Sequence, residues 1–306
     1  MNKNIQHTLF TERYRPANLN DYIGEEYIKN IISSQIEKND IQNYIFWGPA
    51  GTGKTTLAKI IVNSIDCEYI MINASDERGI DTIREKVKTF ASTASFSPLK
   101  IIVFEEFDST TSNAQLSLKV IIEKFSKTTR FIFTCNHIEK VIDPIQSRCQ
   151  VITIVPPSKS DIARHLVAIC NEEKIKYELS DIGKIVNQNY PDIRKMLNII
   201  QSSNVDGIIN LDKGLLVSSN YMDKVLIELK KPKPNFLSIR QLIIDCEDTS
   251  FTDFYRFLFN KSSEYMPGNE GTAAILINEH QYQAQFSIDK QINICSLIYN
   301  LIKNKK

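Results

Sequence analysis

The chain has 306 residues, which is enough for about two domains of ~150 residues each. Hydrophobic residues make up 42% and charged residues 24% of the sequence, and this composition excludes a disordered or fibrous protein. The 37 Lys and Arg residues nearly balance the 36 Asp and Glu residues, so the net charge is +1. Such a small charge argues against a protein that coats DNA by bulk charge, although a locally basic groove remains compatible with it.

Apolar runs alternate with helical patterns in the first half of the chain. Residues 44–47 form a short apolar run that ends at Gly48, and a helix is expected from Leu57 to Ile65. Alternation of this kind indicates an α/β domain with a mainly parallel sheet. Further strands are expected at 69–72, 101–104, 131–134 and 151–155, with a helix at 81–91.

The sequence changes character after Pro156. From there to about 215 the apolar spacing is helical and contains no run typical of a strand. Pro232 and Pro234 then interrupt the chain, and the pattern is helical again to the end. We therefore expect three domains: an α/β domain over 1–155, a small helical domain over 156–220 and a second helical domain over 221–306.

The turn after the first expected strand fits the phosphate-binding pattern GxxxxGK[ST]. Glycines let such a loop fold tightly enough for backbone N–H groups to surround phosphate oxygens, and the next helix adds the positive end of its dipole. Lys54 is expected to reach the β and γ phosphates of ATP, and the Thr55 hydroxyl is expected to bind Mg²⁺. The alternative is a glycine-rich turn with a solvated lysine. The nucleotide-binding residues predicted here are Gly48, Pro49, Ala50, Gly51, Thr52, Gly53, Lys54, Thr55 and Thr56.

Carboxylates follow the apolar run at 101–104. At the carboxyl end of a strand they are expected to point into the nucleotide crevice. Glu105 would then hold Mg²⁺ through water, and Glu106 would polarise the attacking water as general base. The alternative is a solvated acidic turn. The histidines share no metal-binding spacing and no cysteines form a CxxC pair, so Mg²⁺ is the only metal expected.

These motifs and five further segments resemble the AAA+ clamp loaders, namely replication factor C small subunits and the T4-like phage clamp-loader ATPase. The resemblance covers most of the first 200 residues. The segment Phe90–Phe96 weakly favours the phage branch. The five further segments, in chain order, are Glu12–Pro16, Asn73–Asp81, Thr134–Asn136, Pro144–Cys149 and Pro191–Leu197.

The resemblance implies roles for side chains outside the phosphate loop. Asn136 would lie near the γ-phosphate, and Arg194 would contact the nucleotide in cis from the helical lid. Arg148 would act in trans on the γ-phosphate of a neighbouring subunit, as an arginine finger. For both arginines the alternative is a structural or surface ion pair. The adenine pocket would be lined by Tyr14, Arg15 and Pro16.

The resemblance also implies contacts with DNA and with the clamp. Template phosphates would meet helix N-termini, where backbone N–H groups bind phosphate without many basic side chains. The alternatives are a solvated loop for Arg78 and packing on the sheet for the clamp residues. The candidates for DNA are Arg78, Gly79, Ile80, Thr111 and Ser112, and those for the clamp are Val87, Phe90 and Ala91.

One residue departs from the family pattern. Glu105 stands where the family usually has Asp, and its side chain is one methylene longer. Nucleotide binding is still expected. The hydrolysis rate is the open point, because Mg²⁺ requires near-ideal octahedral geometry and the longer side chain shifts the carboxylate.

The resemblance predicts an α/β P-loop AAA+ domain with a parallel five-stranded sheet, followed by a helical lid and an all-α collar. The expected function is that of an ATPase subunit of a sliding-clamp loader. Its expected partners are the sliding clamp, other clamp-loader subunits in a hetero-oligomer, expected to be a pentamer, and primer–template DNA. The alternatives are a non-hydrolysing structural subunit of the same complex, or another AAA+ DNA-processing machine.

The expected location is the cytoplasm, which would be that of the host for a phage protein, or the nucleus for a eukaryotic one. The amino terminus has no apolar core of a signal peptide, and no run of ~20 apolar residues is present, so no membrane partner is expected.

Overall fold

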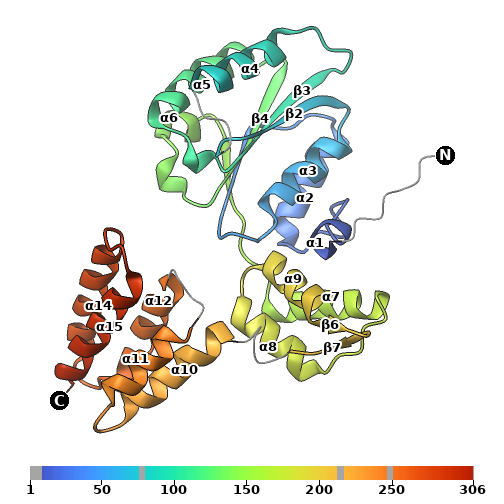
Figure 1. Ribbon diagram of the computed structural model, residues 1–306. Helices are drawn as coiled ribbons and strands as arrows, with labels where there is room; N and C mark the ends of the chain where they lie inside the picture. Colours follow the sequence, from blue (N-terminus) through green and yellow to red (C-terminus); the bar gives the residue numbers. More distant parts are fainter. Residues whose placement is uncertain (1–8, 76–79, 212–216, 247–250, 306) are drawn as a thin grey trace. The chain divides into compact units, whose positions relative to one another are not determined.

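The computed structural model describes residues 9–75, 80–211, 217–246 and 251–305 (Figure 1). The chain divides into two compact units, Met1–Ile209 and Asn210–Lys306. The expected third domain would begin at residue 221, inside helix α10 (Val217–Lys230), and the division into three stays a prediction. Among the described residues, no helix is both long enough and apolar enough to span a membrane.

A parallel sheet of five strands forms the centre of the first unit. Its order is β2-β3-β4-β1-β5, so β1 and β4 lie inside the sheet and β5 at one edge. All five strands coincide with the apolar runs of the sequence, with ends that differ by one or two residues in most of them. The strands are β1 (Tyr44–Trp47), β2 (Cys67–Asn73), β3 (Leu99–Glu105), β4 (Thr129–Cys135) and β5 (Gln150–Thr153).

Helices cover both faces of this sheet (Figure 1). On one face, α2 and α3 pack on side chains such as Tyr44 and Phe46, and on the other face α4, α5 and α6 pack on side chains such as Phe104 and Phe133. Each fully buried side chain of this kind contributes about 1.5–3 kcal/mol of hydrophobic stabilisation. The helices of this part are α1 (Phe10–Arg13), α2 (Glu26–Glu37), α3 (Lys54–Ser64), α4 (Ile80–Ser92), α5 (Ser112–Lys124) and α6 (Asp143–Gln146).

The first unit ends in three helices and a small hairpin. The helices α7 (Lys159–Glu172), α8 (Leu179–Asn189) and α9 (Ile193–Ser203) agree with the helical spacing of the sequence. The expectation that this region contains no strand is wrong, because β6 (Asn204–Val205) pairs antiparallel with β7 (Ile208–Ile209). The turn between them is Asp206-Gly207, with both residues at positive φ, which is the geometry that favours a two-residue hairpin.

The second unit is helical throughout its described residues, as expected. Its core is one cluster of buried side chains that includes Val225, Phe254 and Leu297. Pro232 and Pro234 lie in the turn between its first two helices. After α10 these helices are α11 (Phe236–Ile244), α12 (Thr252–Asn260), α13 (Ser262–Tyr265), α14 (Glu270–Ala284) and α15 (Lys290–Lys303).

Candidate nucleotide-binding site

The phosphate loop lies between β1 and α3, where two glycines determine its path. A Cβ atom on Gly48 would lie 2.4 Å from the carbonyl oxygen of Ile154, so a larger residue cannot take this position without a shift of the backbone. Gly53 has φ +92° and precedes α3 without a side chain that caps the helix. The first N–H groups of α3, which begins at Lys54 rather than at Leu57, are therefore available to bind an anion.

Lys54 is the charged side chain of this loop and is only 8% exposed. Its Nζ atom donates hydrogen bonds to the carbonyl oxygens of Gly48 (2.9 Å) and Pro49 (2.7 Å) and to Oδ1 of Asn136 (2.9 Å). Burial, with a smaller effect of the Arg194 charge, lowers the pKa of the Lys54 ammonium group. The lysine thus joins the phosphate loop to the residue that follows β4.

Three neighbouring strands bring their carboxyl ends together at this site, because β4 lies between β3 and β1. Glu105 is the last residue of β3 and is half-buried, whereas Glu106 has φ 53° and lines the same polar pocket as Lys54 and Asn136. Asp108 has no predicted role. Its Oδ2 atom accepts hydrogen bonds from the backbone N–H groups of Asn136 (3.2 Å) and of the next residue, and so fixes the turn that carries Asn136.

A less polar pocket adjoins the phosphate pocket, and Gly51, Gly53, Thr56 and Arg194 line both. Arg194 comes from the start of α9, and its contact with a nucleotide stays a prediction. Sequence reasoning missed several residues of this second pocket. The residues that line it include the predicted Tyr14, Arg15 and Pro16 and the unpredicted Tyr22, Ile23, His165 and Leu197.

Contacts with the lid helices hold the amino-terminal segment beside this pocket. The Tyr14 hydroxyl donates to Oε1 of Glu173 (2.6 Å), and burial, together with this hydrogen bond, raises the pKa of Tyr14 to about 12. The backbone N–H of Phe10 donates to Oε1 of Gln201 in α9 (2.8 Å). The pocket is therefore formed jointly by the amino-terminal segment, the phosphate loop and the lid helices.

The chemistry of the two pockets fits a nucleotide with its magnesium ion. The Tyr22 hydroxyl is buried and has no hydrogen-bond partner in the described part of the chain, which leaves it free to bond a polar atom of a base. The uncapped start of α3 and the Lys54 ammonium group suit phosphate oxygens. Thr55 and Glu106 line the phosphate pocket, and their side-chain oxygens are ligands of the kind Mg²⁺ prefers, whereas Glu105 ends β3 and is not among the lining residues.

Arg148 lies apart from both pockets, two residues before the edge strand β5. Its guanidinium group forms an ion pair with Glu123 of α5, with Nε to Oε1 at 2.9 Å, and donates to the carbonyl oxygen of Pro144 (2.6 Å). The side chain is 30% exposed and lines a separate surface hollow with Asn43 and Arg130.

The structure describes the predicted DNA residues only in part. Arg78 and Gly79 lie outside the described residues, and Ile80 is described only as the first residue of α4. Thr111 is exposed, and its hydroxyl accepts from the backbone N–H of Ala114 (3.4 Å) to cap α5, whose first residue is Ser112. The start of α5 is therefore a surface helix N-terminus, and its contact with DNA stays a prediction.

Two of the three predicted clamp residues are buried. Val87 is 0% exposed and Ala91 is 6% exposed, and Val87 packs with the core on the α4 face of the sheet. Their burial favours the alternative, packing on the sheet, for these two side chains. Phe90 is half-buried, and a clamp contact stays a prediction for it alone.

Comparisons with known proteins agree with this geometry. Residues 44–157 match the AAA family, the ATPases associated with various cellular activities. The replication factor C small subunit of Sulfurisphaera tokodaii is 34% identical over 245 residues, which span 76% of this chain and 74% of the relative. That of Aeropyrum pernix is 31% identical over 298 residues, which span 95% of this chain and 87% of the relative. The chain belongs to the replication factor C small-subunit family of AAA+ ATPases.

Two further similarities are informative. A probable replication factor C subunit 5 of Dictyostelium discoideum is 37% identical over 217 residues, which span 68% of this chain and 62% of that protein. A solved structure of RuvB from Thermotoga maritima has a TM-score of 0.59, covers 81% of this chain and 91% of its own, and is 14% identical. At this identity the likeness to RuvB shows the fold alone. The relatives named here come from archaea and a eukaryote and give the phage branch no support.

Proposed function

We propose that this replication factor C-type ATPase is a subunit of a sliding-clamp loader. ATP binding orders an assembly of subunits that holds the clamp open around primer–template DNA, and hydrolysis releases the closed clamp. The observation that carries the proposal is the convergence of Lys54, Glu106, Asn136 and Arg194 on one polar pocket. The full-length similarity to replication factor C small subunits specifies the class of machine.

The proposed nucleotide contacts follow from the two adjoining pockets. The base lies in the pocket of Tyr14 and Tyr22, and the phosphates lie against the start of α3. Lys54 exchanges a loop carbonyl for phosphate oxygens, because an ammonium group has three donors, and two loop carbonyls and Asn136 already occupy them. Arg194 binds the nucleotide from the lid, so that ligand binding is coupled to the angle between lid and sheet domain.

Magnesium would be held by the Thr55 hydroxyl and, through water, by Glu105, and it would neutralise charge on the phosphates. Glu106 acts as the general base that orients and deprotonates the attacking water. Support for this division comes from the position of Glu106 in the pocket, next to the phosphate loop. Glu105, at the end of β3, is proposed to support hydrolysis despite its extra methylene.

Arg148 is proposed to act on the site of a neighbouring subunit. Gln150, two residues after it, pairs with Tyr44 at the amino end of β1, whereas the phosphate loop follows the carboxyl end. The four residues of β1 span about 13 Å at ~3.3 Å per residue, so Arg148 and its own phosphate loop lie at opposite ends of the sheet. An arginine finger at this position therefore requires an oligomer.

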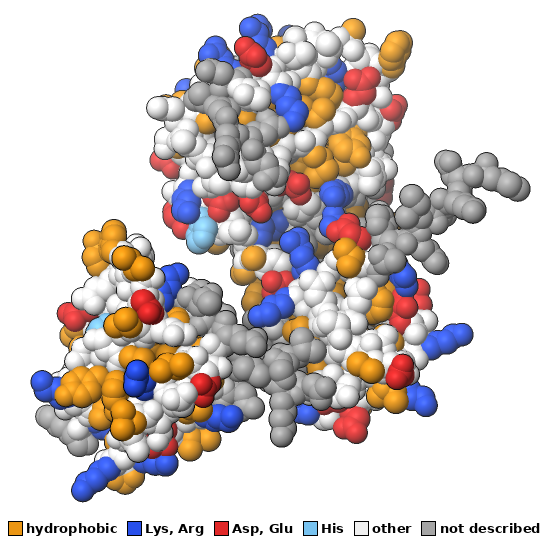
Figure 2. Space-filling view, in the orientation of Figure 1, with side chains coloured by type: hydrophobic (Ala, Val, Ile, Leu, Met, Phe, Trp, Pro, Cys, Tyr) orange, Lys and Arg blue, Asp and Glu red, His pale blue; other side chains and the backbone are white. Residues whose placement is uncertain are grey.

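The second unit is proposed to assemble with other subunits. Figure 2 shows hydrophobic side chains on the visible surface of this unit. Its exposed large hydrophobic residues include Leu237, Phe286, Ile292 and Tyr299. Leu237 and Ile292 line one surface hollow with Ile244, and grouped exposed apolar side chains are typical of an interface, which supports a collar in a hetero-oligomer, proposed to be a pentamer.

The proposal is tested by the rate of ATP hydrolysis of the assembled complex with and without primed DNA and the cognate clamp. We expect turnover that rises when both are present. If the complex still loads clamps when the ATPase site of this subunit is inactive, this chain is a structural subunit instead. Turnover that responds to DNA but not to any clamp would indicate a different AAA+ machine.

A further inference from the structure

The amino end of the sheet, opposite the phosphate loop, contains a polar network centred on Asn43. This residue immediately precedes β1. Its Nδ2 atom donates to the carbonyl oxygen of Arg148 (3.2 Å), and its Oδ1 atom accepts from the backbone N–H of Phe131 in β4 (2.9 Å). Its own carbonyl oxygen accepts from the backbone N–H of Gln150 (2.8 Å). Asn43 thus bonds the main chain on both sides of Cys149 and fastens it to the interior of the sheet.

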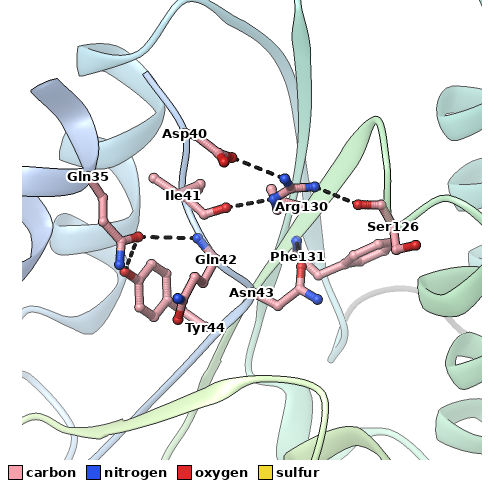
Figure 3. A network of polar contacts seen from close by, with 9 residues as sticks. All are labelled: Gln35, Asp40, Ile41, Gln42, Asn43, Tyr44, Ser126, Arg130 and Phe131. Carbon is pink, nitrogen blue, oxygen red and sulfur yellow. Dashed lines mark hydrogen bonds and ion pairs between the residues drawn. The ribbon is translucent and has the colours of Figure 1, made fainter. Parts of the chain in front are cut away.

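The segment that carries Asn43 is itself held in place (Figure 3). Arg130 donates from Nε to the carbonyl oxygen of Ile41 (2.6 Å), from Nη1 to that of Ser126 (2.7 Å) and from Nη2 to Oδ1 of Asp40 (3.0 Å). On the other side, Oε1 of Gln35 in α2 accepts from the backbone N–H of Gln42 (3.2 Å). The Asn43 amide is therefore a fixed support rather than a mobile surface group.

Arg148 needs such a support on the carbonyl side of its main chain, because within the preceding turn its backbone N–H donates to the carbonyl oxygen of Ile145 (3.1 Å), whereas its carbonyl oxygen accepts from Asn43 (3.2 Å). It precedes an edge strand that pairs only with β1 among the described strands, and its side chain is 30% exposed. The ion pair with Glu123 is solvent-exposed, and such pairs contribute only about 0–1 kcal/mol. The guanidinium group can therefore exchange Glu123 for another anion, provided that its main chain stays in place.

We propose that Asn43 is a positioning residue for the arginine finger: its amide sets the main chain of Arg148, and thereby the reach of the finger into the neighbouring subunit's site. The inference rests on the proposed function, in which Arg148 acts in trans. Misplacement of a catalytic group by about 1 Å costs up to roughly 10²-fold in rate. Loss of the Asn43 support should therefore lower turnover without weakening ATP binding to the chain that carries the change.

The test uses Asn43→Asp in the assembled complex. The variant has nearly the same shape and keeps an acceptor for the Phe131 N–H, but it places a carboxylate oxygen against the Arg148 carbonyl. We expect kcat to fall roughly 10-fold to 100-fold while KM for ATP stays unchanged. The matched control is Asn63→Asp, which makes the same change at an exposed position near the end of α3, outside this network, and whose kcat should equal that of the wild type.

Two further measurements separate positioning from a general structural effect. Asn43→Asp should lower kcat no further in a chain that already carries Arg148→Ala, because the two residues act as one unit. In complexes mixed with Lys54→Ala chains, the defect should appear at sites whose neighbour carries Asn43→Asp. If Asn43→Asp chains do not assemble, Asn43→Ala, which adds no charge, is measured in its place.

Unchanged kcat in the Asn43 variant, together with a large loss in Arg148→Ala, would overturn the inference and leave the finger intact. Unchanged kcat in Arg148→Ala would overturn the proposed trans finger itself, and the role of Asn43 with it. A loss of kcat in Asn43→Asp that adds fully to that of Arg148→Ala would identify Asn43 as a structural residue.

Discussion

Lys54 shows how a single side chain prepares the site for its ligand. Its three N–H donors are matched by three acceptors, two in the phosphate loop and one on Asn136. Phosphate oxygens must therefore replace at least one of these acceptors. Asn136, which is expected near the γ-phosphate, accepts from the same ammonium group. Binding of phosphates at the loop should therefore also change the hydrogen bonding of Asn136.

Glu106→Gln should leave ATP bound and stop turnover. Glu106 lines the phosphate pocket, but the hydrogen bonds of Lys54 go to other residues. The pocket should therefore survive the change. An amide cannot accept the proton of the attacking water, so the rate should fall at least ~10²-fold. Nucleotide affinity and single-turnover hydrolysis, measured on the same preparation, check this. Wild-type turnover would assign the general base to Glu105 or another group.

Glu105→Asp tests whether the site has adapted to the longer side chain. The main chain of Glu105 is fixed, because its carbonyl oxygen accepts from the backbone N–H of Ala74 (2.9 Å). A shorter side chain would move the carboxylate back by one methylene, away from the position around which the rest of the site is arranged. We therefore expect turnover equal to or below that of the wild type. A large gain in steady-state rate would instead show that Glu105 misplaces Mg²⁺.

At the scale of elements, the second unit contains a buried polar group within its apolar core. His280 of α14 is 6% exposed, and its Nε2 atom lies 3.1 Å from Nδ2 of Asn300 in α15. Burial lowers the pKa of His280 below its ordinary value, although Glu279 and Asn293 act in the opposite direction. In the unfolded chain the same imidazole binds a proton at a higher pH than in the fold.

Acidification should therefore destabilise this unit. The unfolded state binds more protons than the folded state once the pH falls below about 6.5, so stability is present above this value and is lost below it. The glutamine of His280→Gln cannot titrate. When the pH is lowered from about 7.5 to about 5.5, the melting temperature of this variant should therefore fall less than that of the wild type. Equal drops in melting temperature for the variant and the wild type would contradict the prediction.

Strands of four or more apolar residues could be predicted from the sequence, whereas strands of two residues could not. The strand at Tyr44–Trp47 was expected with its observed bounds, because a buried parallel strand is a continuous apolar run. The β6–β7 hairpin has only two residues in each strand, too few for any periodicity. Its signal was the dipeptide Asp206-Gly207, which is typical of a two-residue hairpin turn.

The residues of the candidate site likewise divide into those that a local sequence pattern predicts and those that only folding brings together. Lys54 and Thr55 could be predicted because a phosphate loop places its functional groups within one short segment. Tyr22, Ile23 and His165 belong to segments that meet only after the chain folds, and no local pattern marks them. Asp108 could be located as an acidic residue, but its hydrogen bonds to the turn of Asn136 depend on the adjacency of β3 and β4.

At the scale of the whole molecule, the two ends of one sheet serve two different sites. The carboxyl end of β1 leads into the chain's own phosphate loop, and the amino end lies beside Arg148. If Arg148 acts in trans as proposed, each subunit contributes to two interfaces of the assembly, one with its pocket and the other with its finger. ATP hydrolysis should consequently require two adjacent chains.

Mixing two inactive variants tests this directly. Arg148→Ala should bind ATP about as well as the wild type, because the loop contacts of Lys54 survive, and should lose hydrolysis by ~10³-fold or more. Lys54→Ala should lose productive ATP binding. Mixed complexes contain interfaces that pair an intact Lys54 with an intact Arg148 from the next chain, so part of the activity should return. A finger that acts in cis would give no rescue at any ratio. Absence of rescue, in preparations that native mass spectrometry shows to be mixed, would therefore refute the shared site.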